Sequence, residues 1–105
     1  EKIIEEQGKV LAIINDPCHN PTGYSLSMDE WKELRDFFIK TASKGDIILL
    51  NDVAYIDYDF RGEKETRKYM EYFKGLPENI LVIFAFSISK AFTEYGLRVG
   101  AQLAL

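Results

Sequence analysis

Residues 80–90 have the sequence ILVIFAFSISK, in which a run of apolar residues is followed by Ser-Ile-Ser-Lys. An apolar run without polar alternation is typical of a strand in a parallel sheet that is buried on both faces. A strand of this kind that ends in two hydroxyl groups and an amine brings reactive groups to the edge of the sheet. We therefore interpret Lys90 as the candidate nucleophilic amine of a binding site.

Two similar apolar runs lie upstream, at residues 9–15 and 46–52. Between them, Ser27 and Glu30 have the spacing of a capping box, which marks the start of a helix. Apolar residues then recur every three or four positions until Gly45, as expected for a helix that buries one stripe. Residues 1–8 fit the end of another helix.

The rest of the chain continues this alternation of strands and helices. We expect a second crossover helix over residues 63–73, a turn over residues 92–97 and a fourth strand over residues 99–105. Apolar strands separated by helix-length segments indicate an α/β fold with a parallel sheet and right-handed crossovers. Since the fourth run follows residues 80–86 too closely for a helical crossover, it should pair antiparallel.

Composition narrows the class of protein. A chain of 105 residues with 47% hydrophobic residues fits one globular domain, and a net charge of −4 argues against a nucleic-acid surface. No apolar run is long enough to span a membrane, so neither nucleic acid nor membrane is an expected partner. The single cysteine, Cys18, favours a cytoplasmic setting, and with only His19 beside it a zinc site is not expected.

The polar residues that follow the three parallel strands should meet at one edge of the sheet. These segments are residues 16–23, 52–55 and 87–90, and ligands of open α/β sheets bind beyond the carboxyl ends of the strands. Each residue also has an ordinary explanation when taken alone. Lys90 could be a solvated lysine, Asp52 a turn cap and Tyr55 a core residue, whereas Asn20 could be a turn residue and Arg98 a surface charge.

Taken together, these residue types fit one cofactor. An amine among apolar groups can attack carbonyls, and a carboxylate at a strand end can keep a pyridine nitrogen protonated. A phenol and an amide can donate to a ring oxygen, and two hydroxyls with an arginine can hold a phosphate. These are the groups that pyridoxal 5′-phosphate (PLP) requires.

The motifs Asn-Pro-Thr-Gly at 20–23, Asp-Val-Ala-Tyr at 52–55, Ser-Ile-Ser-Lys at 87–90 and Arg-Val-Gly at 98–100 resemble those of class I/II aminotransferases, PLP enzymes of fold type I. The resemblance implies that Lys90 is the Schiff-base lysine and that Asp52 is the partner of the pyridine nitrogen. It implies that Tyr55 and Asn20 bond to the phenolic oxygen of the cofactor. The implied phosphate ligands are Ser87, Ser89 and Arg98.

The resemblance covers residues 1–105 but only the middle of the family's large domain. It implies a cis peptide bond between Asn20 and Pro21, a homodimeric parent enzyme, and substrate and phosphate contacts that lie outside this chain. Four strands in 105 residues cannot cover both faces and both edges of a sheet, so we expect the piece alone to be marginally stable or to depend on a partner. Because the resemblance places part of the site outside this chain, we also expect the piece to be inactive alone.

Three functions are compatible with these residues. The first is a transaminase that moves an amino group between aspartate or an aromatic amino acid and a 2-oxo acid. The second is a C–S lyase or synthase that uses the same lysine. The third is a PLP-binding sensor domain of a transcription regulator, which does not turn over.

Overall fold

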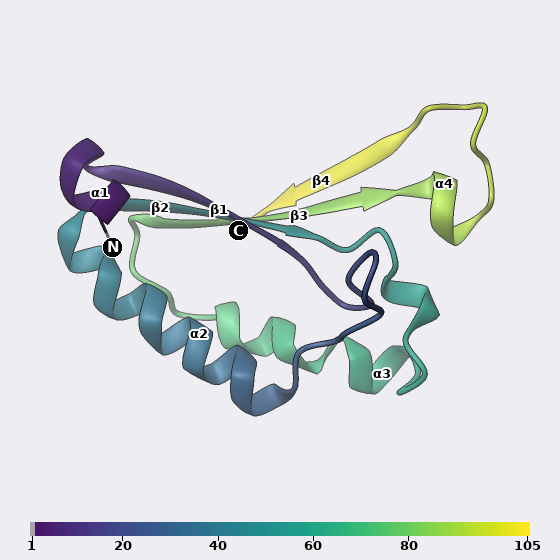
Figure 1. Ribbon diagram of the computed structural model, residues 1–105, viewed down its shortest axis with the longest axis horizontal. Helices are drawn as coiled ribbons and strands as arrows, with labels where there is room; N and C mark the ends of the chain where they lie inside the picture. The colour runs from purple at the N-terminus through teal and green to yellow at the C-terminus, as the bar shows by residue number, and fades with distance from the viewer. Residues whose placement is uncertain (1) are drawn as a thin grey trace.

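The computed structural model describes residues 2–105, in which a four-stranded sheet carries helices on one face (Figure 1). The strands β1 (Lys9–Asn15), β2 (Asp46–Asp52), β3 (Ile80–Ser87) and β4 (Gly100–Ala104) lie side by side in this order. The first three are parallel, and β4 is antiparallel to β3. The expected α/β fold with an antiparallel last strand is confirmed.

The two helices expected before β2 are also confirmed. Helix α1 (Lys2–Gln7) ends at a glycine, although Glu1 of the expected segment lies outside the described residues. Helix α2 (Met28–Thr41) begins with the capping box, in which the Ser27 hydroxyl accepts from the Glu30 N–H at 3.2 Å and the Glu30 carboxylate accepts from the Ser27 N–H at 2.8 Å. A short 3-10 helix, η1 (Ala42–Lys44), connects α2 to β2.

The single helix expected over residues 63–73 is wrong. This segment forms a one-turn helix, α3 (Glu63–Thr66), followed by a 3-10 helix, η3 (Lys68–Phe73). No side chain caps the start of α3, because residue 62 is a glycine. Two aromatic rings of η3, Tyr69 and Phe73, pack on Trp31 of α2 with ring centroids 4.5 and 5.6 Å apart. Tertiary packing of these rings thus sets the local backbone.

One face of the sheet carries the core. Ile47, Leu49 and Val82 are buried there beneath α2 and η3. On the opposite face Ile13 is 66% exposed and Leu81 is 40% exposed, and Figure 1 shows no helix over that face within residues 2–105. The expectation that the strands are buried on both faces is therefore wrong for the described chain. The strands have the composition of a doubly covered sheet, but the helices between them pack on only one side.

The remaining short elements lie near the carboxyl ends of the parallel strands. A 3-10 helix, η2 (Ile56–Tyr58), follows β2, and a one-turn helix, α4 (Ile88–Ala91), follows β3 directly. The loop over residues 16–23, which follows β1, contains cis peptide bonds before Pro17 and Pro21. The cis bond at Asn20-Pro21 was expected, whereas the one at Asp16-Pro17 was not.

Candidate active site

The carboxyl ends of the three parallel strands meet at one edge of the sheet. Asn15 pairs in register with Asp52, and Asp52 pairs with Ala85, two residues before Ser87. All three polar segments found in the sequence therefore start from neighbouring positions, as the topology predicted.

A hydrogen bond between the side chains of two predicted site residues joins Asn20 and Tyr55. The Asn20 amide nitrogen donates to the Tyr55 hydroxyl at 3.4 Å, although the two residues are 35 positions apart. Both groups are accessible to a ligand, since Asn20 is exposed and Tyr55 is half-buried. A phenol and an amide that already touch can donate together to a single acceptor oxygen.

Lys90 lies in α4, one turn beyond the end of β3. Its ammonium is 5.5 Å from the centroid of the Tyr55 ring and 5.3 Å from that of Tyr95, which is within the range of cation–π attraction. The Tyr58 hydroxyl donates to the Lys90 carbonyl oxygen at 2.8 Å. The lysine backbone is thus tied to the connection after β2, and its amine lies beside the Asn20–Tyr55 pair.

Asp52 is the last residue of β2 and is half-buried. Its carboxylate oxygen Oδ1 accepts from the Ala54 N–H at 3.0 Å. Within residues 2–105 no side chain is hydrogen-bonded to Oδ2, so this oxygen is available to a donor from a ligand.

The three predicted phosphate ligands share the region where β3 meets β4. The Ser87 hydroxyl accepts from the Ser89 N–H at 3.3 Å, and the Ser89 side chain is buried. Arg98 is brought near them because the Ile88 N–H donates to the Val99 carbonyl at 3.4 Å. The Arg98 guanidinium itself contacts the Tyr95 carbonyl at 3.5 Å and is exposed. No described contact joins this guanidinium to either serine.

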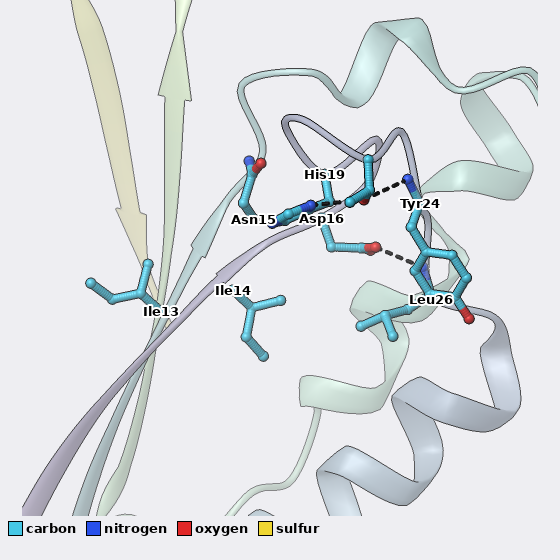
Figure 2. A pocket seen from close by; sticks show the side chains of 8 residues that line it. Ile13, Ile14, Asn15, Asp16, His19, Tyr24 and Leu26 are labelled. Atoms are coloured by element: carbon cyan, nitrogen blue, oxygen red, sulfur yellow. Dashed lines mark hydrogen bonds between the residues drawn. The ribbon is translucent and has the colours of Figure 1, made fainter.

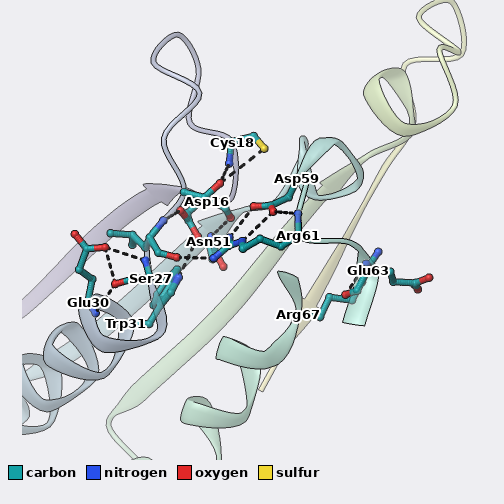
Figure 3. Close-up of polar contacts among 12 residues, drawn as sticks. Asp16, Cys18, Ser27, Glu30, Trp31, Asn51, Asp59, Arg61, Glu63 and Arg67 are labelled. Atoms are coloured by element: carbon teal, nitrogen blue, oxygen red, sulfur yellow. Dashed lines mark hydrogen bonds and ion pairs between the residues drawn. The ribbon is translucent and has the colours of Figure 1, made fainter. Parts of the chain in front are cut away.

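A buried polar network holds the loop after β1, and sequence reasoning missed it (Figure 3). The Asp16 carboxylate accepts from the Leu26 N–H at 2.7 Å and from the Trp31 indole N–H at 3.0 Å. Burial raises the pKa of the Asp16 carboxyl. The sequence feature that could have indicated this network is Trp31, because the N–H of a buried indole requires a hydrogen-bond acceptor.

Asn51 completes this network from the next strand. It is fully buried, and its amide nitrogen donates to the Asp16 carbonyl at 2.9 Å and to the Ile14 carbonyl at 3.2 Å. Its amide oxygen accepts from the Tyr69 hydroxyl at 2.8 Å. Burial raises the pKa of Tyr69, so this hydroxyl stays protonated as a donor. The network fixes the first residues of the loop that carries Asn20.

An ion pair links the segment after β2 to the same loop. The Arg61 guanidinium donates to the Asp59 carboxylate at 2.6 and 2.9 Å and to the Leu26 carbonyl at 3.1 Å. The Asp59 side chain is fully buried, and its hydrogen bonds from Arg61 lower the pKa of its carboxyl well below the usual value.

We expect Asp59→Asn to lower the free energy of unfolding by about 2 kcal/mol at pH 7, because it removes a charged acceptor from a buried bidentate pair. Since the pKa of Asp59 is lowered in the folded state, its contribution is present above about pH 4 and is lost as the pH falls further. Urea unfolding of wild type and variant between pH 7 and pH 3 measures this, and the difference should narrow below pH 4.

The matched control is Asp57→Asn, which breaks the 2.8 Å ion pair of Asp57 with Arg67. Both partners of that pair are accessible to water, so we expect a loss below about 1 kcal/mol. Equal losses for the two variants at pH 7 would contradict a structural role for the buried pair.

A cavity of about 700 Å³ lies beside this edge, between the end of β1 and the loop (Figure 2). The His19 ring nitrogen Nδ1 and the Thr22 hydroxyl are 2.8 Å apart within its wall. Neither Lys90 nor Tyr55 borders it, so it lies next to the predicted site without coinciding with it. The lining residues are Ile13, Ile14, Asn15, Asp16, His19, Thr22, Tyr24 and Leu26.

Residues 2–105 contain no group of three or more potential metal ligands. No helix in the same range is long and apolar enough to cross a membrane.

Comparison with known proteins gives a consistent result. The family model described as "Aminotransferase class I and II" matches residues 1–104. An aromatic-amino-acid aminotransferase from Paracoccus denitrificans is 33% identical over 95 residues, which are 90% of this chain and 22% of that protein. An aspartate aminotransferase from Pseudomonas aeruginosa is 34% identical over 91 residues, which are 87% of this chain and 21% of that protein.

A solved structure is also similar. The crystal structure of an aminotransferase from Anaerococcus prevotii is 43% identical, with a TM-score of 0.89 over 97% of this chain and 25% of that chain. The chain therefore spans between a fifth and a quarter of the length of the proteins that it matches.

Proposed function

The chain belongs to the class I and II aminotransferase family, and from this premise we propose that it forms the lysine-bearing part of the site of a PLP-dependent transaminase. The observation that carries the proposal is the meeting of Asn20, Asp52, Tyr55 and Lys90 at one sheet edge. Its clearest element is the 3.4 Å contact between Asn20 and Tyr55 with the Lys90 ammonium over the tyrosine ring.

These residues fit PLP by their chemistry. Lys90 offers the amine that bonds covalently to an aldehyde. Asp52 offers a protonated ring nitrogen the carboxylate oxygen Oδ2, to which no side chain of residues 2–105 is hydrogen-bonded. The Asn20 amide and the Tyr55 hydroxyl offer two donors to a ring oxygen. Ser87 and Ser89, at and after the end of β3, and Arg98, before β4, offer hydroxyl, N–H and guanidinium groups to a phosphate.

When bound, the cofactor supplies an electron sink for the substrate carbon that loses its proton. Asp52 would keep the ring nitrogen protonated, which maintains the sink. Asn20 and Tyr55 would orient the ring by donating hydrogen bonds to its oxygen. Lys90 would hold the cofactor through its Nζ amine, and the same amine, when free, would accept a proton from one carbon and return it to another. The Lys90 ammonium lies beside the Tyr55 ring. This position favours the proposed role, because it keeps the amine close to Asn20 and Tyr55, the two residues that would donate to the cofactor's ring oxygen.

Aspartate or an aromatic amino acid is the proposed donor, with a 2-oxo acid as acceptor. This choice rests on the relatives, which bear the names of aspartate and aromatic-amino-acid aminotransferases. We also propose that residues 1–105 are part of the large domain of a homodimeric, cytoplasmic enzyme and are inactive alone. The exposed apolar face of the sheet and the share of the relatives' length that the chain covers support this fragment character.

The full-length enzyme tests this proposal. Incubated with PLP, 2-oxoglutarate and single amino acids, it should form glutamate with aspartate, phenylalanine or tyrosine as donor. Glutamate formation is measured by chromatography. Release of pyruvate, ammonia or a thiol from cysteine-type donors without glutamate would indicate a lyase instead. Binding of PLP with no turnover of any donor would indicate a sensor domain.

A further inference from the structure

Asn15 lies where β1 and β2 end together. It is the last residue of β1, is half-buried, and pairs in register with Asp52 of β2. The loop that begins after it carries Asn20. Asn15 therefore lies between two residues that contribute different groups to the proposed site.

The Asn15 side chain is hydrogen-bonded to both of these residues. Its amide oxygen accepts from the Asn20 N–H at 2.8 Å, and its amide nitrogen donates to the Asp52 carbonyl at 3.2 Å. An amide is suited to this bridge, because it carries an acceptor and a donor at the same end of the side chain. Aspartate would offer only acceptors, and alanine would offer neither.

We propose that Asn15 is a positioning residue that fixes the spacing between the Asn20 amide and the Asp52 carboxylate, and thereby the position in which the cofactor ring would bind. This inference rests on the proposed function. The network around Asp16 and Asn51 holds the start of the loop, but in the described chain only the Asn15 side chain bonds to the backbone of both site residues. The ring would need both groups at once, one at its oxygen and one at its nitrogen.

The test compares Asn15→Ala with Asn79→Ala in the full-length enzyme. Asn79 is also half-buried and also bridges backbone groups, since its amide nitrogen donates to the Ala42 and Gly45 carbonyls at 2.8 and 2.9 Å. It lies before β3, at the opposite edge of the sheet. The two variants should therefore lower the thermal midpoint by similar amounts, while only one of them borders the site.

We expect Asn15→Ala to weaken the binding of PLP about tenfold and to reduce the visible circular dichroism of the bound cofactor, which reports a fixed ring. Asn79→Ala should leave both within about twofold of wild type. Equal dissociation constants and spectra for the two variants would overturn the positioning role. Absence of cofactor absorbance in the wild-type protein would instead contradict the proposed function itself. The failure of the positioning role and the failure of the proposed function therefore give different results.

Asn15→Asp decides the question if Asn15→Ala does not fold. It keeps the size of the side chain and the acceptor for the Asn20 N–H, but turns an oxygen toward the Asp52 carbonyl. We expect weaker PLP binding and reduced visible circular dichroism here too. Wild-type values for both in Asn15→Asp would overturn the proposal.

Discussion

Replacement of Lys90 by alanine is expected to lower transaminase turnover in the full-length enzyme by at least about 10⁴-fold. In the proposed function the Lys90 amine both holds the cofactor and moves the proton between two carbons. Its removal therefore abolishes covalent catalysis and acid–base catalysis together. Lys90→Arg should be equally inactive, because it keeps the positive charge but cannot bond to the aldehyde. Glutamate formation with aspartate or an aromatic donor measures the loss.

The control for Lys90 is Lys74→Ala. Lys74 is an exposed lysine that pairs with Glu71 on the surface of the 3-10 segment, away from the sheet edge. Turnover of this variant should remain within about twofold of wild type. Retention of more than a tenth of wild-type turnover by Lys90→Ala would refute the proposed role of this lysine.

Replacement of Asp52 by asparagine is expected to lower turnover by about 10²–10³-fold while leaving the fold intact. Asparagine keeps the oxygen that accepts from the Ala54 N–H, but it loses the charge that would hold a ring nitrogen protonated. Because the change removes stabilisation of charge that develops during the reaction, it should act on kcat more than on KM.

Asp46→Asn is the matched control for Asp52. Asp46 is an exposed carboxylate at the first position of the same strand, seven-residue β2, and therefore lies at the opposite edge of the sheet. Its removal should leave kcat and KM unchanged within about twofold. A similar fall in kcat for both variants would indicate a general effect of the lost charge and would contradict a specific role of Asp52.

The strands were the most predictable part of the fold. Residues 9–15 and 46–52 were predicted with the bounds that β1 and β2 have, because each run is apolar and bounded by glycine, proline or aspartate signals. Parallel pairing then placed Asn20, Asp52 and Lys90 at one edge without further information. Local pattern and topology together were sufficient for that step.

The connections between site residues were less predictable. The bridge from Asn15 to Asp52 and the bond from Asn51 to Asp16 each join positions 35 to 37 residues apart, so no local spacing indicates them. The broken helix after Gly62 has the same origin, because its course depends on aromatic packing against Trp31. The exposed sheet face could not be read from composition, since the strand sequences suit a sheet covered on both sides.

The site itself was predictable in its residue types but not in its contacts. The sequence indicated that an amide and a phenol should act together. In the structure the Asn20 amide nitrogen lies 3.4 Å from the Tyr55 hydroxyl oxygen. The sequence did not indicate that Tyr58 would bond to the Lys90 carbonyl, or that the Arg98 guanidinium would contact the Tyr95 carbonyl. These residues lie on connecting segments, where the contacts of a side chain are set by the tertiary structure and not by the local sequence.

The most direct test of the central claim is the covalent attachment of PLP to Lys90. The full-length enzyme is incubated with PLP and reduced with borohydride, and the modified peptide is identified by mass spectrometry. We predict one stoichiometric pyridoxyl label, on Lys90, which free substrate amine prevents when added before reduction. Labelling spread over surface lysines such as Lys68 and Lys74, with none on Lys90, would contradict the account.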